Sequence, residues 1–226
     1  MKPGIVLFLL LLAAKACFAA EPSGELVELH SCDLYTGGCT ASSEATLLGR
    51  QRFCLWSVRQ GLWSGQDLAG AKVALLEVGS QNLAEKGAVA DRAEIFVPRE
   101  MAPAQKKALL AWLEAERPLP ASISVIETDI CYRRTGNEAE LSVGDTVAVS
   151  TVPLGKCRTG SCGQALWYEP ISRQSTFSVV SSRNSIIRDG RLHLTWTDHD
   201  RPNVFLATFG PGAELTQLAG APWPCH

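Results

Sequence analysis

Residues 191–209, RLHLTWTDHDRPNVFLATF, carry the clearest fold signal in this chain. Apolar and polar side chains alternate through 191–197, which is the period-2 pattern of a strand with one buried face. The polar turn Asp198-His199-Asp200 follows, and 203–209 is strand-like again. Two strands joined by so short a turn pair antiparallel, so this stretch predicts an antiparallel sheet.

Similar strand signals recur through most of the sequence, at 52–58, 72–78, 93–97, 122–132, 139–143, 146–152 and 176–181. The segment 104–116 differs, because it is rich in helix-forming residues, follows Pro103 and precedes Pro118. We therefore expect an α+β fold, mostly antiparallel β, with one amphipathic helix near 104–116. A two-sheet sandwich is one arrangement that fits this pattern. No composition break divides 21–226, which we expect to form a single globular domain.

Residues 1–20 have the layout of a secretory signal peptide. Lys2 supplies the positive end, 5–14 is an apolar run too short to span a bilayer comfortably, and small residues follow at 16–20. We expect cleavage after Ala19 or Ala20 and a periplasmic or secreted protein. Lipidation at Cys17 is the rival prediction, although Lys15 fits poorly in the small-residue box that this signal requires. The sequence predicts no transmembrane segment in the mature chain.

Export changes what the cysteines indicate, because thiols tend to pair in an oxidising compartment. The chain has eight: Cys17, Cys32, Cys39, Cys54, Cys131, Cys157, Cys162 and Cys225. Loss of the leader leaves seven, so at least one is unpaired, metal-bound or intermolecular. Cys157 and Cys162 bracket a short glycine-containing turn and predict a disulfide. Cys32 and Cys39 fit either a second disulfide or a pair of metal ligands.

His30, Cys32, Cys39 and Cys54 form the densest group of soft and borderline ligands in the sequence. His30 and Cys32 are two residues apart at the end of an extended segment, so their side chains share a face. Thiolate and imidazole ligands favour copper(I) or zinc over calcium or magnesium. We expect a soft-metal site here. The alternative is a disulfide-stabilised module that binds a protein or small-molecule partner without a metal.

Several segments resemble domain-of-unknown-function family 1326, a bacterial, cysteine-containing family. These are the cysteines at 32 and 39, the strand from Cys54 into 60–63, LAGAKV at 68–73, the QKKALLAWL helix at 105–113 and the strands within 196–209. The resemblance covers most of the mature chain. It differs from the family pattern at His30, where an earlier cysteine is expected, and at Gly38-Cys39, which replaces Pro-Cys. It implies a shared fold and no established activity.

Charge and motifs exclude several functions. The formal net charge of −2 gives no basic field for nucleic acid. The chain lacks a phosphate-binding loop, a dinucleotide fingerprint and the serine motif of hydrolases, so we assign no catalytic residue and favour a non-enzymatic protein. An exported enzyme that uses His199 or His193 is the third alternative. Candidate pocket-lining residues are Trp167, Tyr168, His193 and His199.

Overall fold

The structure is a computed structural model that describes residues 20–36, 49–154, 165–166, 168–171 and 176–211. Its elements in chain order are β1 (Ser23–His30), β2 (Tyr35–Thr36), β3 (Gln51–Gln60), β4 (Leu62–Trp63), β5 (Gln66–Asp67), β6 (Lys72–Val78), β7 (Arg92–Pro98), α1 (Pro103–Glu116), β8 (Ser122–Thr128), β9 (Ile130–Thr135), β10 (Glu138–Val143), β11 (Val147–Pro153), β12 (Ala165–Leu166), β13 (Phe177–Asp189), β14 (Leu194–Asp198) and β15 (Arg201–Phe209). The signal-peptide prediction falls on 1–20, of which only Ala20 is described.

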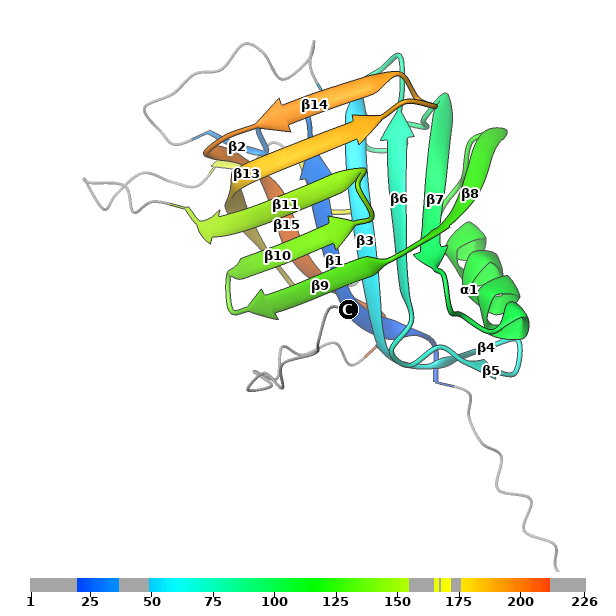
Figure 1. The fold of residues 1–226 in the computed structure, drawn as a ribbon. Helices are drawn as coiled ribbons and strands as arrows, with labels where there is room; N and C mark the ends of the chain where they lie inside the picture. Colours follow the sequence, from blue (N-terminus) through cyan, green and yellow to red (C-terminus); the bar gives the residue numbers. More distant parts are fainter. Residues whose placement is uncertain (1–19, 37–48, 155–164, 167, 172–175, 212–226) are drawn as a thin grey trace, which may run out of the picture.

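One large sheet dominates the molecule, in the order β8-β7-β6-β3-β1-β15-β13-β11-β10-β9, with β14 paired to β13 (Figure 1). All of its pairings are antiparallel except β7 with β8, which are parallel. The expected two-sheet sandwich is therefore wrong, because a single sheet curves until it is nearly closed. The excess of strands and the single helix among the described residues agree with the expectation. The expected pairing of the two strands within 191–209 is wrong: the chain turns at 190–193, so β14 pairs with β13, and β15 pairs with β13 and β1 instead of with β14.

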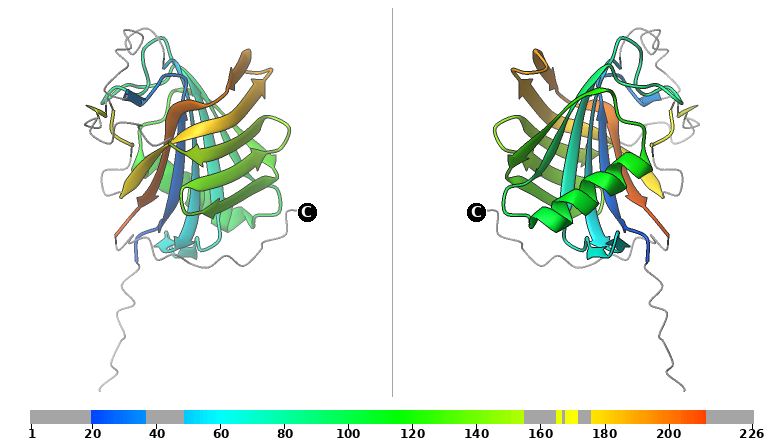
Figure 2. Two further views of the ribbon diagram at one scale, coloured as in Figure 1. Left: turned by 90° about the vertical axis from the view of Figure 1, so that its left-hand side faces the viewer. Right: turned by 90° about the vertical axis from the view of Figure 1, so that its right-hand side faces the viewer.

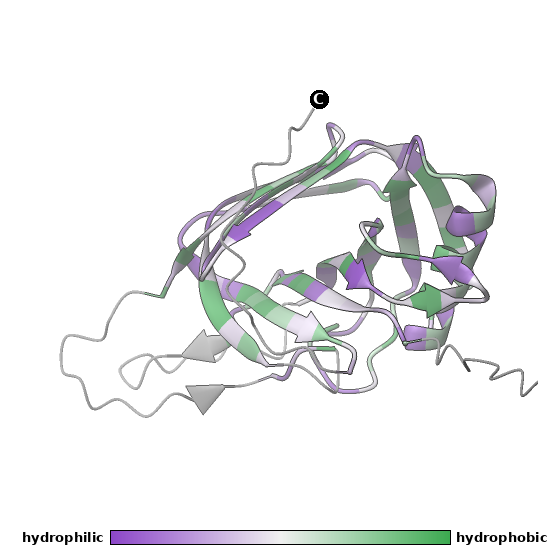
Figure 3. Ribbon diagram, turned by 90° about the horizontal axis from the view of Figure 1, so that it is seen from below, coloured by the Kyte–Doolittle hydropathy of each residue, from purple (hydrophilic) through white to green (hydrophobic). Residues whose placement is uncertain are grey.

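The segment 122–135 explains the near closure of the sheet. The sequence predicts one extended run at 122–132, but the structure divides it into β8 and β9, separated only by Asp129. β8 pairs with β7 at one edge of the sheet, and β9 pairs with β10 at the other edge. The chain thus passes directly from one edge to the other, and the sheet encloses an interior (Figures 1 and 3).

Most of the buried side chains on the concave face of the sheet are apolar. Alternate residues of β1, β3, β6 and β7 point inward and meet those of β10, β11, β13, β14 and β15. The buried members of this interior cluster are Val27, Leu29, Phe53, Leu55, Ala74, Leu76, Phe96, Ala139, Leu141, Val143, Val147, Val149, Val180, Ile187, Leu192, Leu194, Trp196, Val204 and Leu206. These side chains come from strands far apart in the sheet order, so they stabilise the curved form.

Helix α1 covers part of the convex face (Figure 2). It connects the parallel strands β7 and β8, a connection that needs a crossover. Its buried residues are Ala108, Leu109, Trp112 and Leu113, and Trp112 packs against Trp56 of β3 and Phe209 of β15. Pro103 lies in the first turn, and Arg117 leaves the helix in an extended conformation before Pro118.

Among the described residues, no helix is long and apolar enough to span a membrane.

Candidate functional site

The predicted ligands His30 and Cys54 lie on the convex face of adjacent strands. In the β1–β3 register, Glu28 is opposite Cys54 and His30 is opposite Arg52. Since the inward positions of β1 are Val27 and Leu29, Glu28 and His30 point outward. All four of these polar residues are nevertheless buried, so the convex face here is a covered polar layer.

Glu28 fixes the His30 imidazole. The Nε2 atom of His30 lies 3.2 Å from Oε2 of Glu28, while Oε1 of Glu28 accepts a hydrogen bond from the backbone N–H of Ile171 at 2.6 Å. Burial lowers the pKa of His30 despite this hydrogen bond, so the ring is neutral at pH 7. A carboxylate only accepts, so the ring proton is on Nε2 and Nδ1 carries a lone pair. This buried Nδ1 atom has no hydrogen-bond partner among the described residues.

The segment that follows β1 is tied to β15 and its preceding turn. Asn203 donates to the backbone oxygen of His30 at 2.9 Å, and the backbone N–H of Leu34 donates to Pro202 at 2.8 Å. Arg201 completes the attachment with a 2.9 Å hydrogen bond from Nε to Asp33. These contacts hold the segment 30–34 against the sheet and so fix the position of Cys32, which lies in that segment.

Cys32 has a crowded and weakly polar environment. It is 1% exposed and packs with Leu34, Ala84 and Phe205; the Phe205 ring also makes an edge contact with His30. Its Sγ atom lies 3.9 Å from Oδ1 of Asn82. Burial raises the pKa of the Cys32 thiol to about 12, so the thiol is protonated at neutral pH.

Gly49 lets the backbone approach this thiol. Its φ of +86° lies in the left-handed region, and an added Cβ would stand 2.1 Å from Oδ1 of Asn82 and 3.0 Å from Sγ of Cys32. Asn82 also donates to the Tyr168 hydroxyl at 2.9 Å. The predicted pocket residue Tyr168 is thus connected to the Cys32 environment through Asn82.

A buried ion-pair network lies beside His30 and Cys54. Glu77 of β6 accepts from Nε of Arg52 at 2.7 Å and from Nη2 of Arg117 at 2.7 Å. The side chain of Glu77 is 0% exposed, and those of Arg52 and Arg117 are 5% and 6% exposed. Arg52 also donates to the backbone oxygen of Leu83. Burial acts to lower the pKa of Arg52, but the charge and hydrogen bond of Glu77, together with the neighbouring Cys54 and Glu28, outweigh it and the net shift is upward.

Cys54 packs between this network and helix α1. It is fully buried in the cluster that contains Leu26, Trp56 and Trp112, and burial raises the pKa of its thiol. Neither Cys32 nor Cys54 is in a disulfide. Cys54 and His30 both lie on the convex face. Cys54 is opposite Glu28, two residues before His30 on β1.

The structure brings together only part of the predicted metal site. His30, Cys32 and Cys54 lie on or next to the convex face of β1 and β3, whereas Cys39 lies outside the described residues, as do Cys157, Cys162 and Trp167. Within the described ranges, no three His, Cys, Asp or Glu side chains are close enough together to hold a metal ion.

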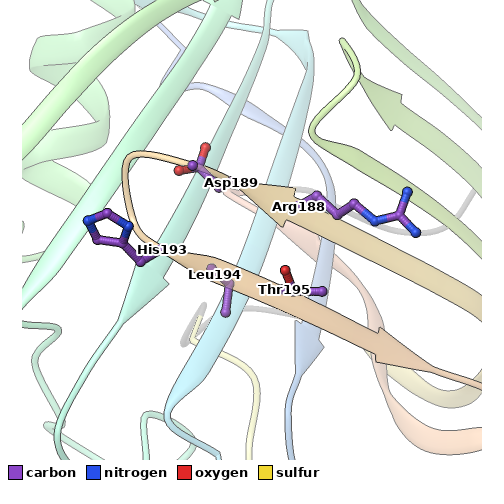
Figure 4. Close-up of a pocket in the computed structure, with 6 residues that line it drawn as sticks. Arg188, Asp189, His193, Leu194 and Thr195 are labelled. Carbon is purple, nitrogen blue, oxygen red and sulfur yellow. The ribbon is translucent and has the colours of Figure 1, made fainter.

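The candidate pocket residues are not brought together. His193 lies in the turn between β13 and β14, where it is exposed and has a φ of +53°. It lines a shallow, open pocket with its turn neighbours (Figure 4). His199 lies at the other end of β14, 73% exposed, with Nε2 3.1 Å from Oδ2 of Asp200. Tyr168 lies near Cys32, apart from both.

Sequence reasoning missed the buried charged residues beside His30 and in the adjoining network, which are Glu28, Arg52, Glu77 and Arg117. Each lies in or beside an apolar stretch, such as LVELH at 26–30 and KVALLEV at 72–78. A charged residue inside a continuously apolar strand is the signal that could have found Glu28 and Glu77, since burial of such a residue requires a partner. The sequence could not say which partners the register supplies.

Comparison with protein-family models, with curated proteins and with solved structures finds no match to this chain. The resemblance to domain-of-unknown-function family 1326 therefore stays a prediction.

Proposed function

We propose that this chain is an exported protein that binds one copper(I) or zinc ion through His30 and Cys32, with Cys39 and Cys54 as the further predicted ligands. The observation that carries the proposal is the buried lone pair on Nδ1 of His30. A carboxylate that holds one imidazole nitrogen while the other is available for a metal is the usual outer-shell arrangement of histidine ligands. Here Glu28 holds Nε2 and leaves Nδ1 without a partner among the described residues.

The neighbouring thiols are consistent with a soft metal. Cys32 follows His30 by two residues, and both contact Phe205. Because burial raises the pKa of the Cys32 thiol to about 12, metal binding would have to displace its proton. Affinity should therefore rise with pH. Cys39, seven residues after Cys32 in the sequence, is the expected third ligand.

The test is a metal titration of the mature protein, reduced and kept free of oxygen. Copper(I) or zinc is titrated in competition with a chromophoric chelator, and bound metal is counted on the same sample. The expected result is one tightly bound ion per chain. Cys32→Ser should weaken binding strongly, and the double change Cys32→Ser, Cys39→Ser should abolish it. His30→Gln should also weaken binding, because it removes the nitrogen ligand.

Cys131→Ser is the matched control. Cys131 lies on β9, five strands away from β1 in the sheet order and therefore far from the predicted ligand His30. Its loss should leave the stoichiometry unchanged. If the reduced wild-type protein binds neither metal, the proposal fails. A disulfide between Cys32 and Cys39, found by peptide mapping of the unreduced protein, would then support the disulfide-stabilised binding module.

A further inference from the structure

The turn between β13 and β14 meets β7 across the interior of the sheet. β7 and β13 are not neighbours, because β6, β3, β1 and β15 separate them in the sheet order. Leu192 and Leu194 of the turn and β14 are nevertheless buried in the interior cluster with Phe96 of β7. The hairpin therefore closes one end of the curved sheet by side-chain contacts rather than by a strand ladder.

Two acidic side chains lie in this closure. Glu94 is two residues before Phe96 on β7, and Asp189 is two residues after Ile187 on β13, so both point to the interior side. Their side chains are buried, with Glu94 1% exposed and Asp189 6% exposed. Within the described residues, no nitrogen or hydroxyl donor forms a hydrogen bond with either carboxylate oxygen of Glu94.

Asp189 lies close enough to Glu94 for its carboxyl group to raise the pKa of Glu94. Two ionised carboxylates only accept hydrogen bonds and repel each other, so this approach is favoured when one of the two carboxyl groups holds a proton. Asp189 also uses Oδ1 to accept the backbone N–H of Leu192 at 2.7 Å, which shapes the turn. The shared proton thus connects β7 directly to the residue that organises the hairpin.

The surrounding charges do not replace this proton. Nη1 of Arg191 lies 3.9 Å from Oε1 of Glu94, beyond hydrogen-bond distance, and the Arg191 side chain is 67% exposed. Arg92 of β7 donates to the backbone oxygen of Leu192 at 3.2 Å and so makes a second contact to the turn. Arg188 and His193 line the shallow pocket beside Asp189 (Figure 4).

We infer that Glu94 and Asp189 form a proton-operated latch that holds the β13–β14 hairpin against β7 when they share a proton and releases it when both are ionised. Release would separate the buried Leu192 and Leu194 from β7 and open the apolar interior to solvent. This inference is independent of the proposed metal site, which lies on the opposite face of the sheet.

The direction of the pH dependence follows from the closed state. Burial, together with the hydrogen bond and the charge of Asp189, raises the pKa of Glu94 from 4.5 to about 7. The closed hairpin binds this proton more tightly than the open one, so rising pH favours opening. The equilibrium constant for opening starts to rise near the ordinary carboxyl pKa. It rises at most about tenfold per pH unit and levels off above about pH 7.

Hydrogen exchange followed by mass spectrometry tests the latch on the full mature chain. Protection factors, which remove the intrinsic pH dependence of exchange, are measured for peptides covering 186–198 and, as an internal reference, 22–30. In the wild type, protection of 186–198 should fall at least tenfold between about pH 5 and about pH 7, while the reference segment changes little.

Two variants can keep the contact between residues 94 and 189 while they remove one of the two titrating carboxyl groups. Glu94→Gln can donate from its amide to Asp189. Asp189→Asn can donate to Glu94 while its oxygen still accepts from Leu192, so it serves if the first variant does not fold. Either should flatten the pH profile of 186–198, whereas Glu114→Gln, an exposed change on α1, should leave it as in the wild type. An unchanged pH profile in a folded Glu94→Gln or Asp189→Asn protein would overturn the inference.

Discussion

The two faces of the curved sheet are both buried, but they are buried in different ways. The concave face is lined by apolar side chains drawn from nine strands. The convex face carries a second apolar cluster under α1. Beside that cluster, β1, β3 and β6 also hold the buried side chains of Glu28, His30, Arg52 and Glu77, together with Arg117 from the end of α1. Apolar burial stabilises a fold in proportion to area, whereas buried charges give little net stability. Apolar packing on both faces therefore stabilises the fold, and the buried charges on the convex face add little net stability to it.

The largest expected effect comes from breaking the buried network on the convex face. Glu77→Gln leaves Arg52 and Arg117 without their counter-charge while preserving the shape of the side chain. Removing one partner of a buried ion pair typically costs about 3–5 kcal/mol. The free energy of unfolding, measured by urea denaturation with circular dichroism, should fall by about that amount.

A companion triple variant tests whether the complete network stabilises the fold or whether only the loss of one partner destabilises it. Arg52→Met, Glu77→Leu and Arg117→Leu together replace the charges by apolar side chains. Such replacements are often neutral or stabilising. We therefore expect the triple variant to be more stable than Glu77→Gln. A triple variant less stable than Glu77→Gln would show that this network contributes to the stability of the fold.

A truncation on the concave face should have an effect of similar or slightly smaller size. Leu29 is fully buried in the interior cluster, so Leu29→Ala removes apolar contacts and leaves a cavity. We expect a loss of about 2–5 kcal/mol in the free energy of unfolding. Val125→Ala on β8 is the control; since Val125 is 48% exposed, its loss should stay below about 1 kcal/mol. Equal losses in the two variants would contradict the burial of Leu29 in the interior cluster.

The smallest effect is expected for an exposed ion pair. Arg133 of β9 and Glu140 of β10 form a salt bridge with side chains 73% and 61% exposed. Exposed pairs contribute about 0–1 kcal/mol, because water and salt screen them. Glu140→Gln should therefore shift the urea midpoint only slightly, and any shift should shrink further in 0.5 M salt. A loss as large as that of Glu77→Gln would contradict the distinction between buried and exposed pairs.

The strands of the sheet could be predicted because their local patterns are strong. The segment 72–78 forms β6 with the expected bounds, and α1 starts one residue before the expected 104–116. The prediction of a two-sheet sandwich was wrong because a strand pattern indicates which positions are buried but does not indicate which strands become neighbours. At 122–132, apolar residues predict an extended chain, but nothing local shows that the chain passes from one sheet edge to the other.

The candidate site divides in the same way. Cysteine and histidine spacing was enough to predict His30, Cys32, Cys39 and Cys54 as candidate soft ligands, since those side chains are chemically distinctive wherever they lie. The sequence did not reveal that Glu28 would hold Nε2 of His30, or that Arg52 and Arg117 would share Glu77. Those pairings depend on strand register and on where α1 ends, and register is set by contacts across the sheet.

The amino-acid sequence by itself determined the strand-rich composition and the position of the helix, because each depends on residues close together in the chain. Only the tertiary structure decided that the sheet closes on itself, that charged residues on its convex face are buried, and that Glu94 meets Asp189. Each of these depends on contacts between segments far apart in sequence, and a local pattern carries no information about which distant segment becomes the neighbour.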